Sequence, residues 1–203
     1  MAFATIDVTK GITGTIPVAN GGTGLASGTT GQFLKFTGST TLASNAVSEG
    51  INMMDAWYQT STQTHSSGEH TFTAWSRMSN ESAKKMTNIG SAMTQSSGIF
   101  TFPATGKYWI MFKSYCNGNS TTNYAGLRIK NNDNNSIASS YVNRYSSGTE
   151  HAHVMAMTFI NVDDVTDDTC KLKFTSNQGA TSTWTSGGEM ETKAFFIRVG
   201  DSS

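Results

Sequence analysis

A glycine-rich stretch near the N-terminus limits what this chain can fold into more than any other feature. Residues 10–38 read KGITGTIPVANGGTGLASGTTGQFLKFTG, in which glycine and threonine separate single apolar residues. Glycine loses more conformational entropy on folding than other residues and adds no side chain to a core. We therefore expect this stretch to become ordered only against a partner, either further copies of the chain or another protein. The apolar positions expected to make these attachment or trimer contacts are Ile12, Ile16, Val18 and Leu25.

The low charge of the chain argues against two classes of partner. Its 203 residues are enough for one core and an accessory segment, but only 14% of them are charged and the net charge is zero. Nucleic acids and anionic membrane surfaces are bound through clustered Lys and Arg, which this composition does not supply. The first residues contain no apolar run after a basic start, and no segment has the length of a membrane-spanning helix. We expect no nucleic-acid partner, no signal peptide and no membrane insertion.

The composition and the residue pattern of the sequence change near residues 46–50. Before this point glycine is frequent and charge is rare, whereas short alternating runs separated by turn-forming residues follow it. We predict an extended attachment or shaft segment at residues 1–48 and a globular domain at residues 49–203.

The globular part is predicted to be all-β. Strand-like runs cover residues 71–78, 107–115, 125–130, 137–145, 151–162, 171–175 and 193–199. In the first of these runs, strict alternation would place Phe72 and Met78 on one face and Trp75 on the other. Residues 81–93 include good helix formers, but Asn88 and Gly90 favour loop and strand there. Short strands between Gly, Asn and Ser clusters indicate a sandwich or jelly roll.

One run resembles the core signature of the C1q/TNF-like jelly roll. Residues 100–112, FTFPATGKYWIMF, contain an aromatic residue, five further residues, Gly106, Tyr108 and then alternating apolar residues. Asn88 stands where that signature has Asn or Asp, and KAFFIRV at 193–199 resembles the closing strand of the family. NVDDVTDDTCKLKF at 161–174 resembles its penultimate hairpin. The sequence departs from the signature at Ser82 and Ile110, where Phe is usual, and at Met93, where an aromatic residue or Leu is usual. The resemblance spans residues 51–199.

This resemblance implies a sandwich that assembles as a homotrimer. In the family, one face of the central strand fills the sandwich and the other face meets neighbouring subunits around a threefold axis. In residues 107–115, Tyr108, Ile110 and Phe112 share one face, while Trp109 and Met111 lie on the other.

Residues 11–38 are similar to a segment common in phage tail-fibre and other virion proteins. Together the two resemblances imply a homotrimeric virion structural protein, attached through its N-terminus to other virion proteins of the tail or capsid and contacting a host surface glycan or protein. One alternative is a capsid decoration or head-fibre protein, which the short shaft favours. Another is a depolymerase, which needs paired carboxylates that the sequence does not display. We expect no enzymatic activity.

Two histidines in the run EHAH at 150–153 are the clearest candidates for metal ligands in the sequence. In a strand, His151 and His153 share one face, and copies meeting at an axis would bring their imidazoles together as transition-metal ligands. Such pairs resemble the metal-holding tips of some phage fibres. The alternative is a pair of solvated or hydrogen-bonded histidines at the end of a strand. We expect no other cofactor.

Aromatic residues in polar loops are the candidates for receptor contact. Loops that mix Tyr or Trp with Ser, Asn and Gly offer stacking surfaces and adaptable hydrogen bonds, although ordinary turns share this composition. The candidates are Tyr141, Tyr145 and Trp184. Residues 131–136 and 163–168 are expected to be plain turns. Cys116 and Cys170 are expected to be reduced and buried, the usual state of cysteines in a chain without a secretion signal.

Overall fold

The computed structural model describes residues 23, 25, 28–39, 41–46, 51–78, 88–118, 123–144, 150–185 and 192–202. The chain divides into two compact units, Met1–Gly50 and Ile51–Ser203. In the described ranges the regular structure is antiparallel β-sheet, with one short 3-10 turn, η2 (Asp168–Cys170). Within the same ranges no helix is long and apolar enough to cross a membrane.

The first unit contains a β-hairpin. Strands β1 (Gln32–Gly38) and β2 (Thr41–Ala46) pair in antiparallel register, with an irregularity between Phe36 and Gly38. This part of the predicted extended segment therefore folds back on itself. Phe33, Leu34 and Phe36 are 45%, 49% and 66% exposed, so the described hairpin has no core of its own. A lone two-stranded hairpin is only marginally stable in water.

The predicted attachment positions lie mostly beyond what the structure describes. Ile12, Ile16 and Val18 are outside the described residues. Leu25 is half-buried in irregular structure, and its backbone N–H donates to Thr23 Oγ1 at 3.4 Å. The role of these positions stays a prediction.

The second unit is built from two antiparallel sheets, as expected for a sandwich. The first sheet contains β3 (Met54–Gln59), β4 (Gln63–His65), β6 (Trp75–Arg77), β9 (Gly106–Gly118), β12 (Glu150–Val162), β14 (Ser182–Trp184) and β15 (Lys193–Gly200). The second sheet contains β5 (Gly68–Thr71), β7 (Thr94–Ser96), β8 (Ile99–Thr101), β10 (Asn123–Asn131), β11 (Ser136–Arg144) and β13 (Leu172–Gln178).

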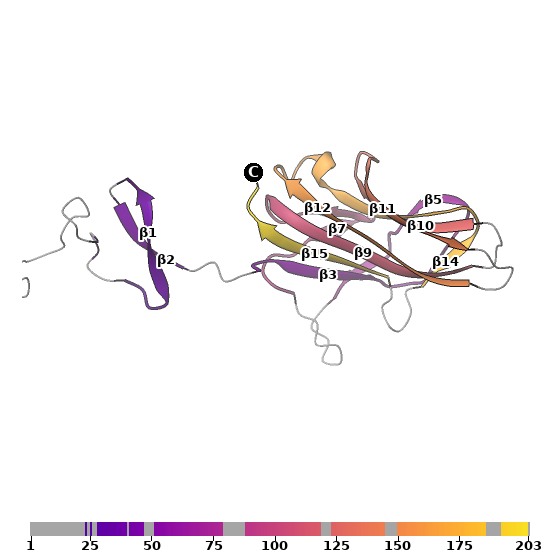
Figure 1. Ribbon diagram of the computed structural model, residues 1–203, viewed down its shortest axis with the longest axis horizontal. Coiled ribbons are helices and arrows are strands. Elements are labelled where there is room, and N and C mark those ends of the chain that lie inside the picture. The colour runs from indigo at the N-terminus through magenta and orange to yellow at the C-terminus, as the bar shows by residue number, and fades with distance from the viewer. Residues whose placement is uncertain are drawn as a thin grey trace, which may run out of the picture. The chain divides into compact units, whose positions relative to one another are not determined.

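Strand β9 organises the first sheet. It pairs with β12 along its whole length and with β15 and β14 on its other side. Figure 1 shows β3, β15, β9 and β12 side by side in that order. The prediction that Tyr108, Ile110 and Phe112 share a buried face is confirmed, since all three are fully buried. Trp109 and Met111, on the opposite face, are only half-buried.

The core between the sheets is rich in aromatic rings. Phe112 of β9 and Phe174 of β13 approach from opposite sheets, with ring centroids 4.7 Å apart. Phe100 of β8 and Phe196 of β15 contact each other at 5.2 Å, and Phe100 also contacts Phe174 at 5.2 Å. Rings bury more apolar area than most side chains and gain from edge-to-face contacts, so this cluster accounts for much of the packing.

The expected alternation across residues 71–78 is wrong. Phe72, Trp75 and Met78 are all buried, a spacing of three rather than two. The chain leaves β5, which pairs with β13 in the second sheet, and enters β6, which pairs with β3 in the first. The crossing residues are not in a strand, and Trp75 Nε1 donates to the carbonyl oxygen of Phe72 at 2.8 Å across them. Because the chain passes from one sheet to the other here, it does not keep the two-residue alternation of a strand, and Phe72, Trp75 and Met78 all face the core between the sheets.

Two signature residues have clear structural roles. Pro103 lies in the bend between β8 and β9, where its missing N–H costs no ladder hydrogen bond. Asn88 ties β3 to the residue that follows β6, because its Oδ1 accepts from the N–H of Ala56 at 3.2 Å and its Nδ2 donates to the carbonyl of Met78 at 2.6 Å.

The prediction for the cysteines is confirmed, since Cys116 and Cys170 are free thiols and both are buried.

Candidate functional site

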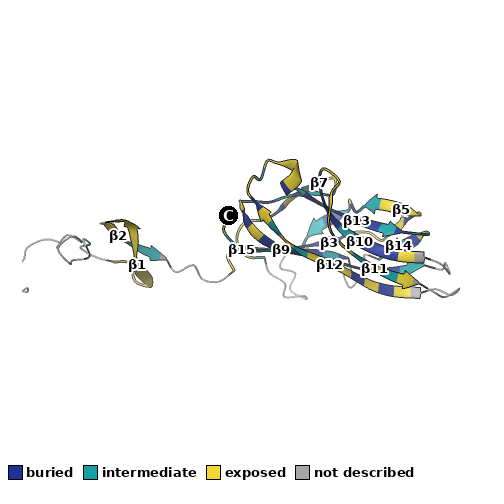
Figure 2. Ribbon diagram, turned by 45° about the horizontal axis from the view of Figure 1, so that its top comes forward, coloured by how far each residue is buried: buried dark blue, intermediate teal, exposed yellow. Residues whose placement is uncertain are grey.

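The outward face of the first sheet carries a large apolar patch, beside which lie Lys113, opposite Met155, and Lys193, opposite Lys113. On β12, Met155, Met157 and Phe159 are 45%, 48% and 69% exposed, while Ala152, Val154 and Ala156 between them are buried. Figure 2 shows this alternation as exposed and buried bands along the strand. We call the following residues the outer apolar face: Met54, Trp109, Met111, Met155, Met157, Phe159, Phe195 and Ile197.

Strand register makes this face continuous. Phe159 lies opposite Trp109 and Met157 opposite Met111 in the β12–β9 pair. On the other side of β9, Phe195 lies opposite Met111 and Ile197 opposite Trp109. Monomeric proteins rarely expose a contiguous apolar patch of this kind, and each large apolar side chain gains roughly 1.5–3 kcal/mol when it is fully buried. The outer apolar face therefore has the character of an interaction surface.

The two predicted metal ligands lie at one end of the same face. His151 and His153 are exposed on β12, and the tyrosine ring of Tyr115 on β9 contacts both, with centroids 5.4 Å and 4.9 Å away. A hydrogen bond joins Tyr115 Oη and His151 Nδ1. In the described part of one chain, no group of three or more His, Cys, Asp or Glu side chains could hold a metal ion.

The three candidates for receptor contact do not lie at one site. Tyr141 is 42% exposed on β11, where its hydroxyl accepts from Arg128 Nε and its ring lies 5.6 Å from that of Tyr124. Tyr145 is outside the described residues. The prediction for Trp184 is wrong, because its side chain is only 1% exposed. The expected loop contains the short strand β14, which pairs with β4 and β9 and turns the indole into the core against Phe72.

Tyr141 adjoins a cluster of charged groups through Arg128. Glu69 of β5 accepts from Arg128 and from Lys130, one cation at each carboxylate oxygen. Burial acts to raise the pKa of Glu69, but the hydrogen bonds from these two cations outweigh it, so the pKa is lowered. Burial likewise acts to lower the pKa of Arg128, and its hydrogen bonds to Tyr141 and Glu69 outweigh that effect and raise it. Glu69 is therefore held ionised and orients both cations.

A buried carboxylate missed by the sequence reasoning holds one end of the core. Asp55 is fully buried and accepts from Arg77 Nε at 2.6 Å, Trp57 Nε1 at 3.0 Å and the backbone N–H of Met93 at 2.8 Å. Buried carboxylates need such partners because an unpaired charge in a core is very costly. The only signal of this residue in the sequence was an acidic side chain inside an apolar run. Its burial and its three donors indicate a structural role for Asp55.

A buried histidine was also missed. His65 Nδ1 is 2.6 Å from Ser176 Oγ, and its Nε2 is 3.1 Å from Gln63 Oε1. Its ring stacks on that of His70, with centroids 4.9 Å apart. Burial, and next the nearby His70, lower the pKa of His65 from 6.5 to about 4.

The acidic run after β12 forms local turns, as predicted. Asp164 accepts from the N–H and hydroxyl of Thr166, and Asp167 caps η2 by accepting from the N–H of Thr169 at 2.8 Å. Asp168 pairs with Lys171 at 2.7 Å. These carboxylates are engaged by groups within the turn.

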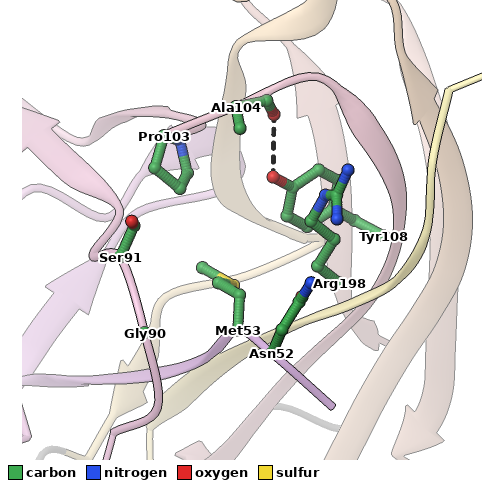
Figure 3. A pocket seen from close by; sticks show the side chains of 8 residues that line it. All are labelled: Asn52, Met53, Gly90, Ser91, Pro103, Ala104, Tyr108 and Arg198. Atoms are coloured by element: carbon green, nitrogen blue, oxygen red, sulfur yellow. Dashed lines mark hydrogen bonds between the residues drawn. The ribbon is translucent and has the colours of Figure 1, made fainter. Parts of the chain in front are cut away.

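A cavity of about 320 Å³ lies beside the start of β9 (Figure 3). Figure 3 shows Tyr108 and Arg198 at its wall, with the Tyr108 hydroxyl directed at the carbonyl of Ala104, to which it donates at 2.7 Å. Arg198 donates to the carbonyl of Thr105 at 3.1 Å and to Asp201 at 2.7 Å. Both polar side chains are therefore engaged in holding the ends of β9 and β15, which favours a structural role.

Comparisons with known proteins bear on the fold. No protein-family model matches the sequence, and no curated protein matches it significantly. Among solved structures, Eiger TNF from S. frugiperda is similar with a TM-score of 0.53 and 14% identity, over 75% of this chain and 96% of that one. Murine APRIL is similar with a TM-score of 0.50 and 7% identity, over 72% of this chain and 98% of that one. PRD1 vertex protein P5 is 20% identical with a TM-score of 0.44, over 74% of this chain and 99% of its own.

The first two likenesses cover about three quarters of this chain and nearly all of each similar structure. At such low identity they carry the architecture and no activity. The fold of the chain is a TNF-like jelly roll, as the signature in residues 100–112 implied.

Proposed function

We propose that the protein is a homotrimeric phage virion structural protein whose jelly roll forms a knob. The observation that carries the trimer is the outer apolar face, where Met155, Met157 and Phe159 stand exposed on one strand. A lone subunit would leave these side chains in water. The C1q/TNF-like resemblance implies that the same sheet face meets neighbouring copies around a threefold axis, which would bury them.

The glycine-rich N-terminal segment supports the virion assignment. Its resemblance to segments of phage tail-fibre proteins implies attachment to other virion proteins, and the exposed apolar residues of the β1–β2 hairpin offer a surface for that contact. The knob would then project and contact a host surface glycan or protein. Many weak contacts on one particle raise the effective affinity, so no catalytic chemistry is required.

Two measurements test this function. Sedimentation of the purified chain should give a trimer, and a stable monomer would contradict the proposed assembly. Imaging of labelled particles should place the protein at the tail, whereas label distributed over the head would favour the capsid-decoration alternative. The absence of label from the particle would exclude both virion roles.

A metal at the threefold axis is a further part of this proposal. In a trimer, His151 and His153 of the three copies could converge beyond the apolar face. If the Nδ1 of His151 donates to Tyr115 Oη, its Nε2 keeps a lone pair for a metal. Elemental analysis of the purified trimer should find a transition metal at stoichiometric level in the wild type and none in His151→Ala. A metal-free wild-type trimer would rule out the metal and leave the assembly untouched.

A further inference from the structure

A row of side chains crosses the exposed face of the second sheet. Strand register places Tyr141 of β11 opposite Gly126 of β10, Gly126 opposite Asn177 of β13, and Asn177 opposite Glu69 of β5. Residues in such register lie beside one another on the same face of a sheet. Because Gly126 has no side chain, the row has a hollow in its middle.

The ring of Tyr141 crosses this hollow. A Cβ atom added at Gly126 would overlap Cδ1 and Cε1 of the tyrosine ring. The ring therefore lies over the backbone of β10, and the side chain is still 42% exposed to solvent. Glycine at this position lets an aromatic ring lie against the sheet instead of standing away from it.

Neighbouring groups hold the ring in this orientation. Arg128 Nε donates to the Tyr141 hydroxyl, and Glu69 accepts from the same guanidinium. The guanidinium carbon of Arg128 lies 5.6 Å from the ring centroid. On another side, the ring of Tyr124 meets that of Tyr141 edge to face at 5.6 Å and 67°. The ring of Tyr141 is thus held in place before any ligand binds, which lowers the entropic cost of binding.

Two amides complete the site. An open depression of about 340 Å³ is lined by Tyr124, Arg128, Tyr141, Asn143 and Asn177. Within the described part of the chain, the side chains of Asn143 and Asn177 form no hydrogen bond. Each amide supplies both donors and an acceptor, and such pairs suit vicinal hydroxyl groups.

We propose that this depression binds a neutral pyranose ring of a glycan, stacked on Tyr141 and hydrogen-bonded through Asn143 and Asn177. The face of an aromatic ring carries negative potential and attracts the weakly positive C–H groups of a sugar. The Arg128 guanidinium is already engaged by Glu69 and Tyr141, which favours a neutral ligand over an acidic one.

The glycan site rests on the proposed function only in taking its ligand from a host surface. The probe is an array of neutral and acidic cell-surface oligosaccharides, applied to the full chain in its native assembly state. We expect binding to neutral glycans that resists 0.5 M salt. Purely ionic contacts should weaken there, because the Debye length is about 10 Å at 0.1 M salt and only about 3 Å at 1 M. Tyr141→Ala and Gly126→Ala should each weaken binding by at least about tenfold, the first by removing the ring and the second by displacing it.

Ile137→Ala is the matched control, because Ile137 is exposed on the same strand and does not line the depression. It should leave binding unchanged. If Tyr141→Ala does not fold, the double variant Asn143→Ala/Asn177→Ala reports on the same site and should also lose at least tenfold.

Three results would overturn the glycan site: no glycan bound by the wild type, wild-type-like binding by the Tyr141 and Gly126 variants, or binding confined to acidic glycans and abolished by salt. Each is separable from the proposed function. Sedimentation as a trimer and location on the virion do not depend on the depression, so they would stand if the glycan site failed.

Discussion

At the scale of single residues, the side chains that hold this sandwich together are partly polar. Asp55 is fully buried and gathers a guanidinium, an indole N–H and a backbone N–H. Each donor comes from a different part of the chain, from β6, β3 and the segment before β7. One carboxylate therefore links three segments that apolar packing alone would leave less well defined.

Replacement of Asp55 by Ala should lower the free energy of unfolding by about 3–5 kcal/mol, because Arg77 and two further donors would lose their acceptor in or near the core. Chemical denaturation at fixed protein concentration measures this loss. Asp55→Asn keeps an acceptor and should lose less. A change below about 1 kcal/mol for the alanine variant would show that the network is not important for stability.

His65 should make stability depend on pH. Its pKa is lowered from 6.5 to about 4 in the folded protein, so between these values the unfolded chain takes up a proton that the folded chain does not. Stability should be constant above about pH 6.5 and fall as the pH is lowered toward 4. We expect a loss on the order of 1–2 kcal/mol from this group, because solvent screening reduces the full effect of the shift.

Thermal melts of the wild type and of His65→Gln across this pH range measure the contribution. The variant lacks the titrating group, so the difference between the two proteins should shrink or reverse at low pH. Carboxylates such as Glu69 titrate in both proteins and cancel in the comparison. Parallel pH profiles would argue against the proposed role of His65.

At the scale of elements, β12 separates core from surface. Its even-numbered residues from Ala152 to Ala156 pack inward. Its odd-numbered residues face outward and are first two histidines and then Met155, Met157 and Phe159. The strand is paired with β9 and ends the first sheet on that side. An edge strand with exposed apolar side chains invites association unless another surface covers it.

Met157→Lys should disrupt the proposed trimer, since burying an unpaired ammonium in an apolar interface costs several kcal/mol. Sedimentation velocity should show monomer for this variant at concentrations where the wild type is trimeric. Thr94→Lys adds the same charge on β7, at the far edge of the second sheet, and should remain trimeric. If both variants sediment as the wild type does, the outer apolar face is not the assembly interface.

At the scale of the whole molecule, folding and assembly should be coupled. Ligands or partners that bind only the native state raise its apparent stability by mass action. The melting temperature of the knob should therefore rise with protein concentration, as scanning calorimetry over a hundredfold dilution series would show. A melting temperature independent of concentration would indicate a subunit that is stable without its neighbours.

Much of this architecture was predictable from the sequence, because alternation reports which side of a strand is buried. The runs at 107–115, 151–162 and 193–199 correspond to β9, β12 and β15, and Tyr108, Ile110 and Phe112 share the buried face. The alternation failed at residues 72–78, where the chain crosses between sheets. It also failed for Trp184, whose polar neighbours are typical of a loop although its ring is in the core.

By itself, the sequence indicated the all-β class through its local periodicity and composition, and one contiguous run, through its resemblance to a family signature, implied the jelly roll. Only the tertiary structure decided which distant residues meet: Asp55 with Arg77, His65 with Ser176, and Tyr141 with Gly126 and Arg128. Such contacts depend on strand register and on which strands are neighbours in a sheet. Register is a relation between segments far apart in the chain, and a local pattern carries no record of it.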